Sequence, residues 1–306
     1  MFEITFFGTS ASAPSPKRNL PSYLVQHDEI RFLVDCGEGT QRQILQSGIG
    51  FKRLNRVLIT HGHLDHILGL GGLLSTFMRW ETIDHLEIYA GASALERISD
   101  LINSVVLRGT RPPMPISFIP VKPGLIFESS DFTISAFPVN HRGPDCYGYL
   151  FEEKGHQPFL ADKAETLGIP PGPLRGRLVK GETVILPTGQ QITPSMVMGE
   201  FKPGARLAAL GDVGETDSLV NLLHDVDGMV IESTYLDEES EMARQYGHLT
   251  ARHAARFARQ VNAGSLILTH FSRRYRDKDI LAEARSVFER VSVAHDFDTF
   301  TIKKED

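Results

Sequence analysis

A histidine-rich turn between a buried strand and a glycine-rich helix is the feature that most constrains how this chain can fold. Residues 60–66 read Thr-His-Gly-His-Leu-Asp-His. The apolar run Arg56–Thr60 predicts a buried strand, and Ile67–Leu74 predicts a helix. A solvated loop that is rich in histidine by chance is the alternative, but such loops do not usually connect two apolar elements. The turn carries four side chains of the types that hold zinc and similar ions: His61, His63, Asp65 and His66.

The spacing of these four side chains predicts two metal sites rather than one. At extended spacing His61 and His63 point the same way. Asp65 and His66 begin the next element, from which they can reach a second point nearby. Two ions need more ligands than one turn supplies, so further ligands must come from elsewhere in the chain.

Three later residues each follow an apolar strand and can supply these ligands. His141 follows Ile134–Val139, Asp212 follows Leu207–Leu210, and His270 follows Leu266–Thr269. Each alone is equally well explained as a turn or capping residue. Together with the first cluster they make seven ligands. His61, His63 and His141 are predicted to hold one ion, Asp65, His66 and His270 the other, and Asp212 to bridge them.

Two ions about 4 Å apart can bind a water molecule between them and lower its pKa towards ~7. The resulting hydroxide is a nucleophile at neutral pH without a serine or cysteine. Nitrogen and oxygen ligands favour two Zn²⁺, with Mn²⁺, cobalt or iron as other possibilities.

Two further residues are candidates for supporting roles. Asp35 ends a predicted strand and can either orient a ligand histidine or cap the helix expected from Thr40. His248 lies just before a helix whose N-cap is predicted at Thr250, where a solvated loop histidine is the alternative.

Composition indicates a soluble globular protein. The chain has 306 residues, of which 41% are hydrophobic and 23% charged, and its net charge is -6. This balance argues against a surface coated in basic charge but allows a local basic patch. Cys36 and Cys146 are far apart, which excludes a disulfide scaffold and suits a reducing cytoplasm. No signal peptide precedes the first strand, and no apolar run reaches the roughly 20 residues that span a bilayer, so we expect a cytoplasmic protein without a membrane segment.

The predicted elements begin with several strands, after which strands and helices alternate. This order occurs twice along the chain. Such a pattern predicts an α/β protein with two mixed sheets packed face to face and helices outside. The predicted strands are Ile4–Phe7, Ser22–Gln26, Arg31–Val34, Leu86–Tyr89, Leu125–Phe127, Phe132–Val139, Tyr147–Glu152, Arg206–Leu210, Gly228–Ile231, Ser265–Thr269 and Thr299–Ile302. The predicted helices are Thr40–Ser47, Gly69–Phe77, Ala92–Leu107, Thr216–Leu223, Ala251–Gln260 and Lys278–Val287.

The stretch Ala161–Gly204 breaks this pattern, because it is rich in proline and glycine. We expect neither core sheet nor helix in it. Residues 166–181 contain Arg175, Arg177 and Lys180 but no acid. A solvated linker is one explanation, and a protruding arm whose cations meet an anionic partner is the other.

The ligand pattern resembles the metallo-β-lactamase superfamily, whose signature is H-x-H-x-D-H, and within it the ribonuclease Z family of short-form tRNA 3′-processing endonucleases. The resemblance covers nearly the whole chain. A small departure is Leu249, where the family usually has serine. Four further stretches carry the resemblance to this family: Phe7–Ser10 with Pro14–Asn19, the proline-rich Gly168–Leu174, Gly247–Thr250 downstream of Glu232–Tyr235, and His270–Tyr275.

The resemblance implies a four-layer αββα sandwich, with a single domain over residues 1–306 and a flexible arm, or exosite, inserted at about 155–204. It implies removal of the 3′ trailer from precursor tRNA by hydroxide attack, leaving a 3′-OH on the tRNA and a 5′-phosphate on the trailer. Asp65 would accept a proton and His248 would protonate the leaving oxygen. Family members are usually homodimers. The implied RNA contacts are Lys17, Arg18, Arg273 and Arg274 near the site and Gly172, Pro173, Arg175, Arg177 and Lys180 on the arm.

Two other functions fit parts of the pattern. A hydrolase or phosphodiesterase of the same fold could act on a small ester or cyclic phosphodiester, but a small substrate needs no arm. An RNA-binding or structural protein with a degenerate metal site is disfavoured, because all seven expected positions hold ligand-type residues.

Overall fold

The computed structural model describes residues 1–81 and 83–304, so the last two residues of the predicted domain lie outside the described part. The chain forms two compact units. Unit 1 comprises residues 1–152 and 205–306, and unit 2 comprises residues 153–204. The predicted insertion at 155–204 corresponds closely to unit 2.

The first sheet of unit 1 has seven strands in the order β16-β1-β2-β3-β4-β5-β6. Its strands β16, β1, β2 and β3 are antiparallel neighbours, and β3 to β6 run parallel. The strands are β1 (Phe2–Gly8), β2 (Ser22–His27), β3 (Ile30–Val34), β4 (Arg56–Leu58), β5 (Leu86–Ala90), β6 (Ile116–Pro120) and β16 (Thr299–Ile302).

The second sheet has the order β15-β14-β13-β12-β9-β8-β7. Strands β12 to β15 run parallel, β9 is antiparallel to β12, and β7 is antiparallel to β8. The strands are β7 (Gly124–Glu128), β8 (Phe132–Pro138), β9 (Tyr147–Glu153), β12 (Arg206–Ala209), β13 (Gly228–Glu232), β14 (Leu266–Thr269) and β15 (Val291–Val293).

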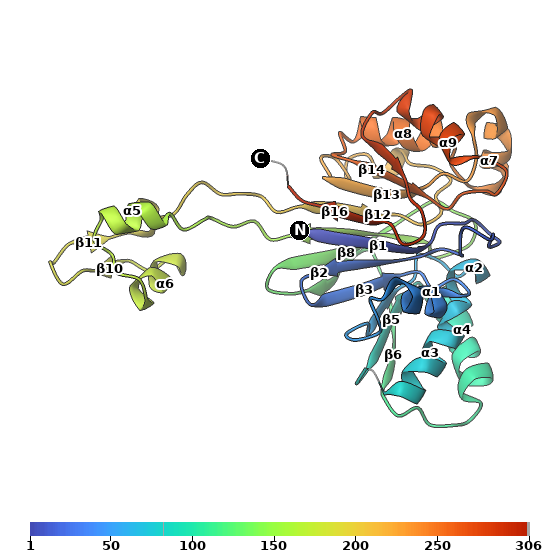
Figure 1. The fold of residues 1–306 in the computed structure, drawn as a ribbon, viewed down its shortest axis with the longest axis horizontal. Coiled ribbons are helices and arrows are strands. Elements are labelled where there is room, and N and C mark those ends of the chain that lie inside the picture. The colour runs from blue at the N-terminus through green and yellow to red at the C-terminus, as the bar shows by residue number, and fades with distance from the viewer. Residues whose placement is uncertain (82, 305–306) are drawn as a thin grey trace. The chain divides into compact units, whose positions relative to one another are not determined.

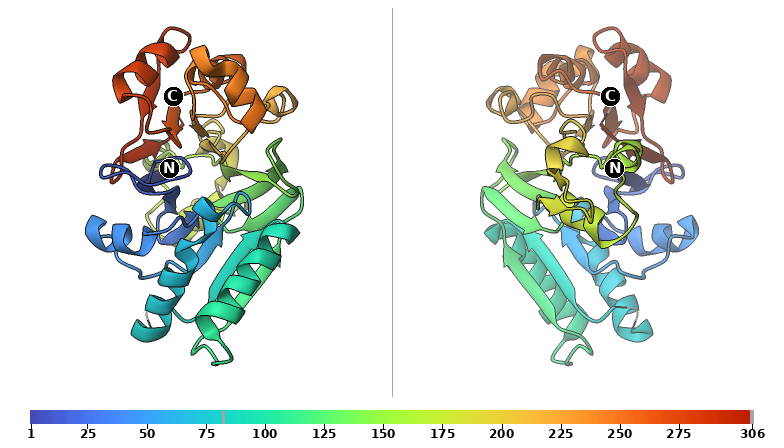
Figure 2. Two further views of the ribbon diagram at one scale, coloured as in Figure 1. Left: turned by 90° about the vertical axis from the view of Figure 1, so that its right-hand side faces the viewer. Right: turned by 90° about the vertical axis from the view of Figure 1, so that its left-hand side faces the viewer.

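Helices cover the outer face of each sheet, as Figures 1 and 2 show. On the first sheet lie α1 (Thr40–Ser47), α2 (Leu64–Ile67), α3 (Gly69–Trp80), α4 (Ala92–Asp100) and the π-helix η1 (Leu101–Leu107). On the second lie α7 (Ser240–Tyr246), α8 (Ala251–Gln260) and α9 (Asp277–Arg285), with the 3₁₀ turns η3 (Asp217–Leu219) and η4 (Asp237–Glu239).

Three apolar clusters hold these layers together. One lies between α1, α3, α4 and the first sheet, and another between α8, α9 and the second sheet. The third lies between the sheets and is rich in aromatic rings, among them Phe2, Phe32 and Phe151. Phe2 packs edge-on against Phe151 with ring centroids 5.8 Å apart. The predicted α/β sandwich of four αββα layers is therefore confirmed.

Some predicted elements differ from the structure. Predicted helix Thr216–Leu223 is only the short turn η3, since Asp, Ser and Asn compete for backbone hydrogen bonds and disfavour a helix. The predicted helix Ala92–Leu107 changes to a π-helix after Asp100. Strands β6 and β15 were not expected, because each is short and lies at a sheet edge.

The expectation of neither sheet nor helix in Ala161–Gly204 is wrong. Unit 2 packs a small apolar core that includes Ile169, Leu178 and Ile192. Pro173 stands at the first turn of α6, where its missing N–H costs no helical hydrogen bond. Its elements are α5 (Ala161–Thr166), α6 (Pro173–Val179), the hairpin strands β10 (Val184–Ile185) and β11 (Gln191–Ile192), and the 3₁₀ turn η2 (Pro194–Met196).

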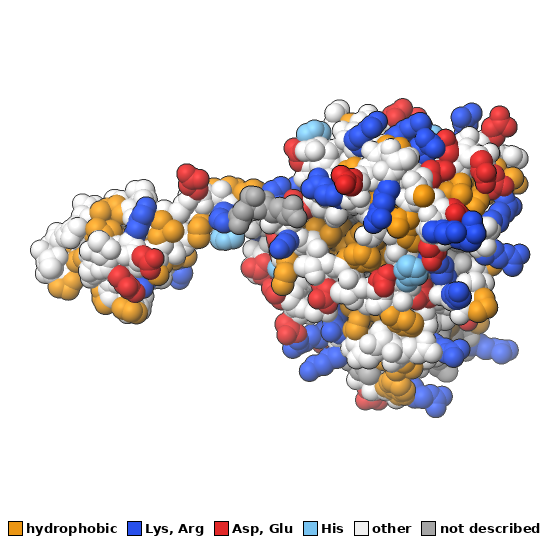
Figure 3. Space-filling model, turned by 45° about the horizontal axis from the view of Figure 1, so that its top comes forward, with side chains coloured by type: hydrophobic (Ala, Val, Ile, Leu, Met, Phe, Trp, Pro, Cys, Tyr) orange, Lys and Arg blue, Asp and Glu red, His pale blue; other side chains and the backbone are white. Residues whose placement is uncertain are grey.

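The surfaces of both units mix charged and hydrophobic side chains. On the face of unit 1 drawn in Figure 3, Lys and Arg side chains alternate with Asp and Glu. Unit 2 exposes hydrophobic side chains, including Val179, Ile185 and Phe201, which are 53%, 68% and 63% exposed. The net negative charge of the chain is therefore compatible with local cationic positions on unit 1.

Candidate metal centre

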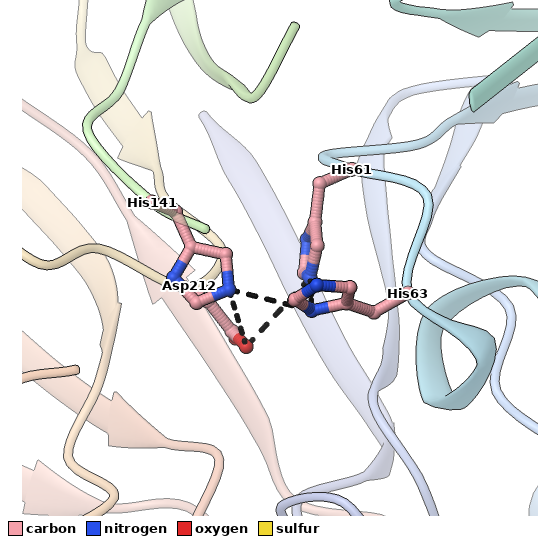
Figure 4. A group of neighbouring side chains, drawn as sticks. All are labelled: His61, His63, His141 and Asp212. Atoms are coloured by element: carbon pink, nitrogen blue, oxygen red, sulfur yellow. Dashed lines mark hydrogen bonds and ion pairs between the residues drawn. The ribbon is translucent and has the colours of Figure 1, made fainter. Parts of the chain in front are cut away.

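The predicted ligands lie just beyond the ends of four strands of the two sheets. The turn after β4 carries His61 and His63, and the short helix α2 that follows it carries Asp65 and His66. His141, Asp212 and His270 follow β8, β12 and β14. These strand ends lie at one rim of the sandwich. Figure 4 shows His61, His63 and His141 directed towards one another and towards Asp212. The fold thus brings together all seven side chains.

Asp212 stands between two groups of histidines. Its Oδ2 lies 3.7 Å from Nε2 of His61 and 3.7 Å from Nε2 of His141. Its Oδ1 lies 3.5 Å from Nε2 of His66 and 3.3 Å from Nε2 of His270. Each carboxylate oxygen therefore faces a different pair of imidazoles, which is the arrangement of a carboxylate that bridges two ions.

The remaining distances complete the two groups. His63 Nδ1 lies 2.8 Å from His61 Nε2 and 3.4 Å from His141 Nε2. Asp65 Oδ2 lies 3.8 Å from His66 Nε2 and 3.7 Å from His270 Nε2. Within each group the possible ligand atoms all lie within 4.8 Å of one another. This is the compactness that one ion per group requires.

Three of these atoms have no other partner. Among the described residues, His66 Nε2, Asp212 Oδ1 and His270 Nε2 are buried and lack a hydrogen bond. Buried polar atoms left unpaired are costly, and here three of them converge on one point. A cation held by all three would remove that cost, so the residues fit a metal ion.

The protonation of the first group also suits a metal. Burial lowers the pKa of His61, and the neighbouring His66 lowers it further. Burial is likewise the main cause that lowers the pKa of His63 and of His141. These imidazoles are therefore neutral at neutral pH, which is the form that binds metal.

Asp35 links two of the ligand histidines. Its Oδ2 lies 2.7 Å from His66 Nδ1, and its Oδ1 accepts the backbone N–H of Thr60 at 2.8 Å. The Thr60 hydroxyl in turn contacts His61 Nδ1 at 3.0 Å. Helix α1 begins after Gly39 and has no side-chain cap. Of the two roles considered for Asp35, the geometry favours orientation of a ligand.

Two other ligand histidines, His141 and His270, are oriented through Nδ1 in the same way. His141 Nδ1 lies 2.7 Å from the Gly247 carbonyl oxygen, which accepts its hydrogen. His270 Nδ1 lies 2.9 Å from the Thr234 hydroxyl. Such contacts fix the ring orientation, so that Nε2 faces the metal position.

His248 lies beside the ligands but pairs with a different acid. Its Nδ1 is 2.8 Å from Oε1 of Glu232, which is fully buried, and 3.9 Å from Oδ2 of Asp212. Burial alone would lower the pKa of His248, but the Glu232 carboxylate raises it to about 9. His248 is therefore protonated at neutral pH. Sequence reasoning missed Glu232, although an acid ending the apolar strand β13 was a usable signal.

The side chains predicted to contact RNA on unit 1 differ in their exposure and in their ion pairs. Lys17 and Arg273 are exposed, and Arg274 is exposed but donates to Glu239 at 2.9 Å. The Arg18 side chain is only 11% exposed and pairs with Asp277 at 2.7 Å. Arg18 also donates to the Ala294 carbonyl oxygen at 2.6 Å, so it holds loops together rather than offering its charge to a phosphate.

The predicted contacts on unit 2 show a similar division. Arg175 donates to the Ile169 carbonyl oxygen at 2.8 Å and thereby braces the proline-rich loop. Arg177 pairs with Glu182 at 2.7 Å while remaining half exposed. Gly172, Pro173 and Lys180 are exposed. Of the three cations, Lys180 and Arg177 are accessible to a ligand.

Comparison with known proteins identifies the family. Residues 2–164 match the family model described as anti-Pycsar protein Apyc1, and residues 177–271 match the β-lactamase superfamily domain. Ribonuclease Z of Bradyrhizobium diazoefficiens is 44% identical over 302 residues, covering 99% of this chain and 100% of the relative. The chain belongs to the ribonuclease Z family. Ribonuclease Z of Archaeoglobus fulgidus is 37% identical and covers 97% of this chain and 96% of its own.

Solved structures agree with membership of the ribonuclease Z family. The short form of human tRNase Z has a TM-score of 0.69 at 26% identity, covering 98% of this chain and 99% of that one. A diphosphatase of the PhnP family has a TM-score of 0.66 at 18% identity and full coverage of both chains, which shows a shared fold alone. In the described part of the chain, helices long and apolar enough to cross a membrane are absent.

Proposed function

We propose that this protein is an endoribonuclease that removes the 3′ trailer from precursor tRNA. The cut leaves a 3′-OH on the tRNA and a 5′-phosphate on the trailer. The observation that carries the proposal is the complete seven-ligand set around Asp212, in a chain 44% identical to a ribonuclease Z along its whole length. A hydrolase of small esters would explain the ligands but not the full-length likeness to an RNA-processing family.

The deciding experiment is incubation of the purified protein with a precursor tRNA that carries a 3′ extension. We expect one cut immediately after the mature tRNA end, with a free 3′-OH on the tRNA fragment and a 5′-phosphate on the trailer. Sequencing both fragments and testing their ends with phosphatase and ligase measures this. Failure to cut, or a 2′,3′-cyclic phosphate end, would contradict the proposal.

We infer two Zn²⁺ per subunit, one held by His61, His63 and His141, the other by Asp65, His66 and His270, with Asp212 shared. When bound, such ions activate a water molecule at neutral pH and offset charge on the phosphate. The convergence of unpaired buried atoms from His66, Asp212 and His270 supports this assignment. Mn²⁺ could occupy the same nitrogen and oxygen ligands.

Removal of the metal is expected to abolish cleavage without unfolding the protein. The sandwich is held by three apolar clusters that do not include the ligands, so the chelated protein should keep its circular dichroism spectrum. Mass spectrometry of the metals should give two ions per chain before chelation, and adding Zn²⁺ should restore cleavage. A chain that cleaves fully after chelation would contradict a metal-dependent mechanism.

We assign to Asp65 the role of accepting a proton from the attacking water. Burial raises the pKa of its carboxyl, but the nearby imidazoles of His270 and His66 together hold that pKa below its usual value. The backbone N–H of Ser12 donates to Asp65 Oδ2 at 3.0 Å and fixes the carboxylate. The carboxylate is therefore ionised and held in one orientation. Its lowered pKa makes it a weak base, so it would accept a proton from a water molecule that bound metal has already made acidic.

His248 supplies the proton for the other end of the reaction. As the P–O3′ bond breaks, the leaving 3′ oxygen of the tRNA gains negative charge, and a proton from the imidazolium neutralises it. The buried Glu232, 2.8 Å from Nδ1, both orients the ring and keeps it charged. Nε2 is then the nitrogen available to the substrate.

Cations near the site and on unit 2 are proposed to hold the tRNA backbone. Lys17, Arg273 and Arg274 on unit 1 are assigned to phosphates near the cut, and Arg177 and Lys180 on unit 2 to a more distant part of the tRNA. Phosphate contacts position a substrate without reading its sequence, which suits an enzyme that must accept every tRNA. Cleavage should therefore weaken steeply as salt increases.

Removing unit 2 is expected to abolish cleavage of precursor tRNA and to spare a small phosphodiester. In the ladder between β9 and β12, Glu152 pairs with Arg206, so residues 154–204 can be replaced by an Asn-Gly turn that closes a hairpin. Hydrolysis of bis(p-nitrophenyl) phosphate and metal content should stay near the wild-type values. Efficient tRNA cleavage by this variant would contradict the arm assignment.

We further propose a homodimer located in the cytoplasm, where precursor tRNA is processed. Leu64 in α2 and Leu68, which directly follows α2, are 52% and 41% exposed, and this apolar surface supports association between subunits. Light scattering coupled to size-exclusion chromatography should give a mass of about twice the 34.0 kDa of one chain. A monomer at micromolar concentration would contradict the dimer.

A further inference from the structure

An exposed tyrosine and an arginine form a pair at the rim of the metal centre, and no role described so far uses them. Tyr246 is the last residue of α7 and is 40% exposed. The guanidinium carbon of Arg142 lies 5.6 Å from the centre of the Tyr246 ring. Arg142 itself is exposed. The pair therefore presents an aromatic ring and a positive charge to solvent.

The pair is fixed to the site through the backbone on both sides. Arg142 directly follows the ligand His141, whose Nδ1 lies 2.7 Å from the carbonyl oxygen of Gly247. Gly247 directly follows Tyr246. Gly247 has φ 68, and a Cβ added there would lie only 3.1 Å from Cγ of Arg142. Glycine at this position thus allows both the left-handed turn and the close approach of Arg142.

The pair lies on the side of the site that carries the proton donor. His248 is two residues after Tyr246, and its ring centre is 5.1 Å from that of His141. In the proposed reaction His248 meets the 3′ oxygen that leaves the phosphorus. That oxygen belongs to the last nucleotide of the mature tRNA, so this nucleotide must lie next to the pair.

We propose that Tyr246 and Arg142 hold the nucleotide that bears the leaving 3′ oxygen, with its base stacked on this pair and its 5′ phosphate near the Arg142 guanidinium. This inference rests on the proposed function. Splayed-out bases stack on aromatic rings and guanidinium planes regardless of base identity. A stacking contact therefore positions the 3′ oxygen for His248 while accepting any base.

Substitution of Tyr246 tests the stacking contact. Tyr246→Leu, which keeps much of the volume but removes the aromatic face, should raise KM or lower kcat/KM for precursor tRNA by about tenfold or more. Tyr246→Phe and Tyr246→Trp should keep near wild-type efficiency, because both retain an aromatic face. Loss of efficiency in the Phe variant equal to that in the Leu variant would overturn the stacking role.

The substrate provides the second half of the test. A precursor tRNA with an abasic nucleotide immediately before the cleavage site should be cut poorly by the wild type. Tyr246→Leu should lose little more on this substrate, because the stacking partner is already gone. If the substitution and the abasic site reduce kcat/KM independently, the base lies elsewhere and the assignment is wrong.

The proposed phosphate contact of Arg142 is tested by removing its positive charge. Arg142→Ala should weaken tRNA binding and reduce the slope of log affinity against log salt by about one. The matched control is Arg259→Ala, which removes an exposed positive charge from the end of α8 and should leave the slope unchanged. An equal change in both variants would overturn a specific contact.

The outcomes separate this inference from the proposed function. If the wild type does not cut precursor tRNA, the proposed function fails. If the wild type cuts, but Tyr246→Leu and Arg142→Ala cut equally well, only the nucleotide contact fails. Hydrolysis of bis(p-nitrophenyl) phosphate by each variant, taken as a ratio to tRNA cleavage, separates substrate positioning from damage to the metal centre.

Discussion

Replacing Asp212 with asparagine is expected to reduce cleavage of precursor tRNA by about 10³-fold or more and to lower the bound metal below two ions per chain. The carboxylate lies between the two histidine groups, with Oδ2 3.7 Å from His61 Nε2 and Oδ1 3.3 Å from His270 Nε2. An amide keeps the shape but offers one neutral oxygen and an NH₂ group that cannot bind a cation. One of the two groups therefore loses its shared ligand.

Metal content by mass spectrometry and kcat for both tRNA and bis(p-nitrophenyl) phosphate are the measurements. Both activities should fall together, because Asp212 serves the metal centre rather than the recognition of tRNA. The matched control is Asp217→Asn, an exposed carboxylate five residues later in η3, which should change neither quantity. Two bound ions with normal turnover in Asp212→Asn would show that Asp212 does not bridge.

Replacing His248 with asparagine is expected to slow cleavage of precursor tRNA by about 10²- to 10⁴-fold while both metal ions remain bound. In the proposed reaction the imidazolium protonates a 3′ alkoxide, which is a poor leaving group. The nitrophenolate released from bis(p-nitrophenyl) phosphate is stable without a proton. The rate on this small diester should therefore fall far less than the rate on tRNA.

Glu232→Gln should produce a smaller loss in the same direction. The glutamine amide can still contact Nδ1, but without the carboxylate the pKa of His248 falls from about 9 towards its ordinary value. Less of the imidazole is then protonated at neutral pH. His253→Asn, on the neighbouring helix α8, serves as the control.

Equal losses on tRNA and on the small diester in His248→Asn would indicate that His248 binds metal instead of donating a proton.

Much of the fold could be read from local patterns. Helices α1 and α8 begin and end where the sequence predicted, since apolar periodicity and flanking glycine or threonine mark their ends. Most strands of the two large sheets were found because they are apolar runs, whereas the edge strands β6 and β15 were not. The segment Thr216–Leu223 was predicted as a helix, and its buried Leu219 and Leu223 have helical spacing, but only the short turn η3 forms there.

The largest difference between the predicted and the observed secondary structure lies in unit 2. Its prolines were taken to exclude helix and sheet, yet Pro173 and Pro194 each stand at the start of a helical turn. The position of a proline within an element, rather than its presence, decides whether it disrupts. The sequence contained this information, but it could be used only once the elements were known.

The seven metal-ligand candidates came from the sequence alone, because four lie in one histidine-rich turn and the start of the next helix, and the other three each follow an apolar strand. That pattern depends only on neighbours along the chain. Three other pairs join residues that are far apart in sequence. They are the ion pair of His248 with Glu232, the ion pair that occupies Arg18 with Asp277, and the contact between Arg142 and Tyr246. Charges and rings on separate loops meet only after both sheets have packed, so the tertiary structure alone decided which side chains hold the site together and which remain exposed at its rim.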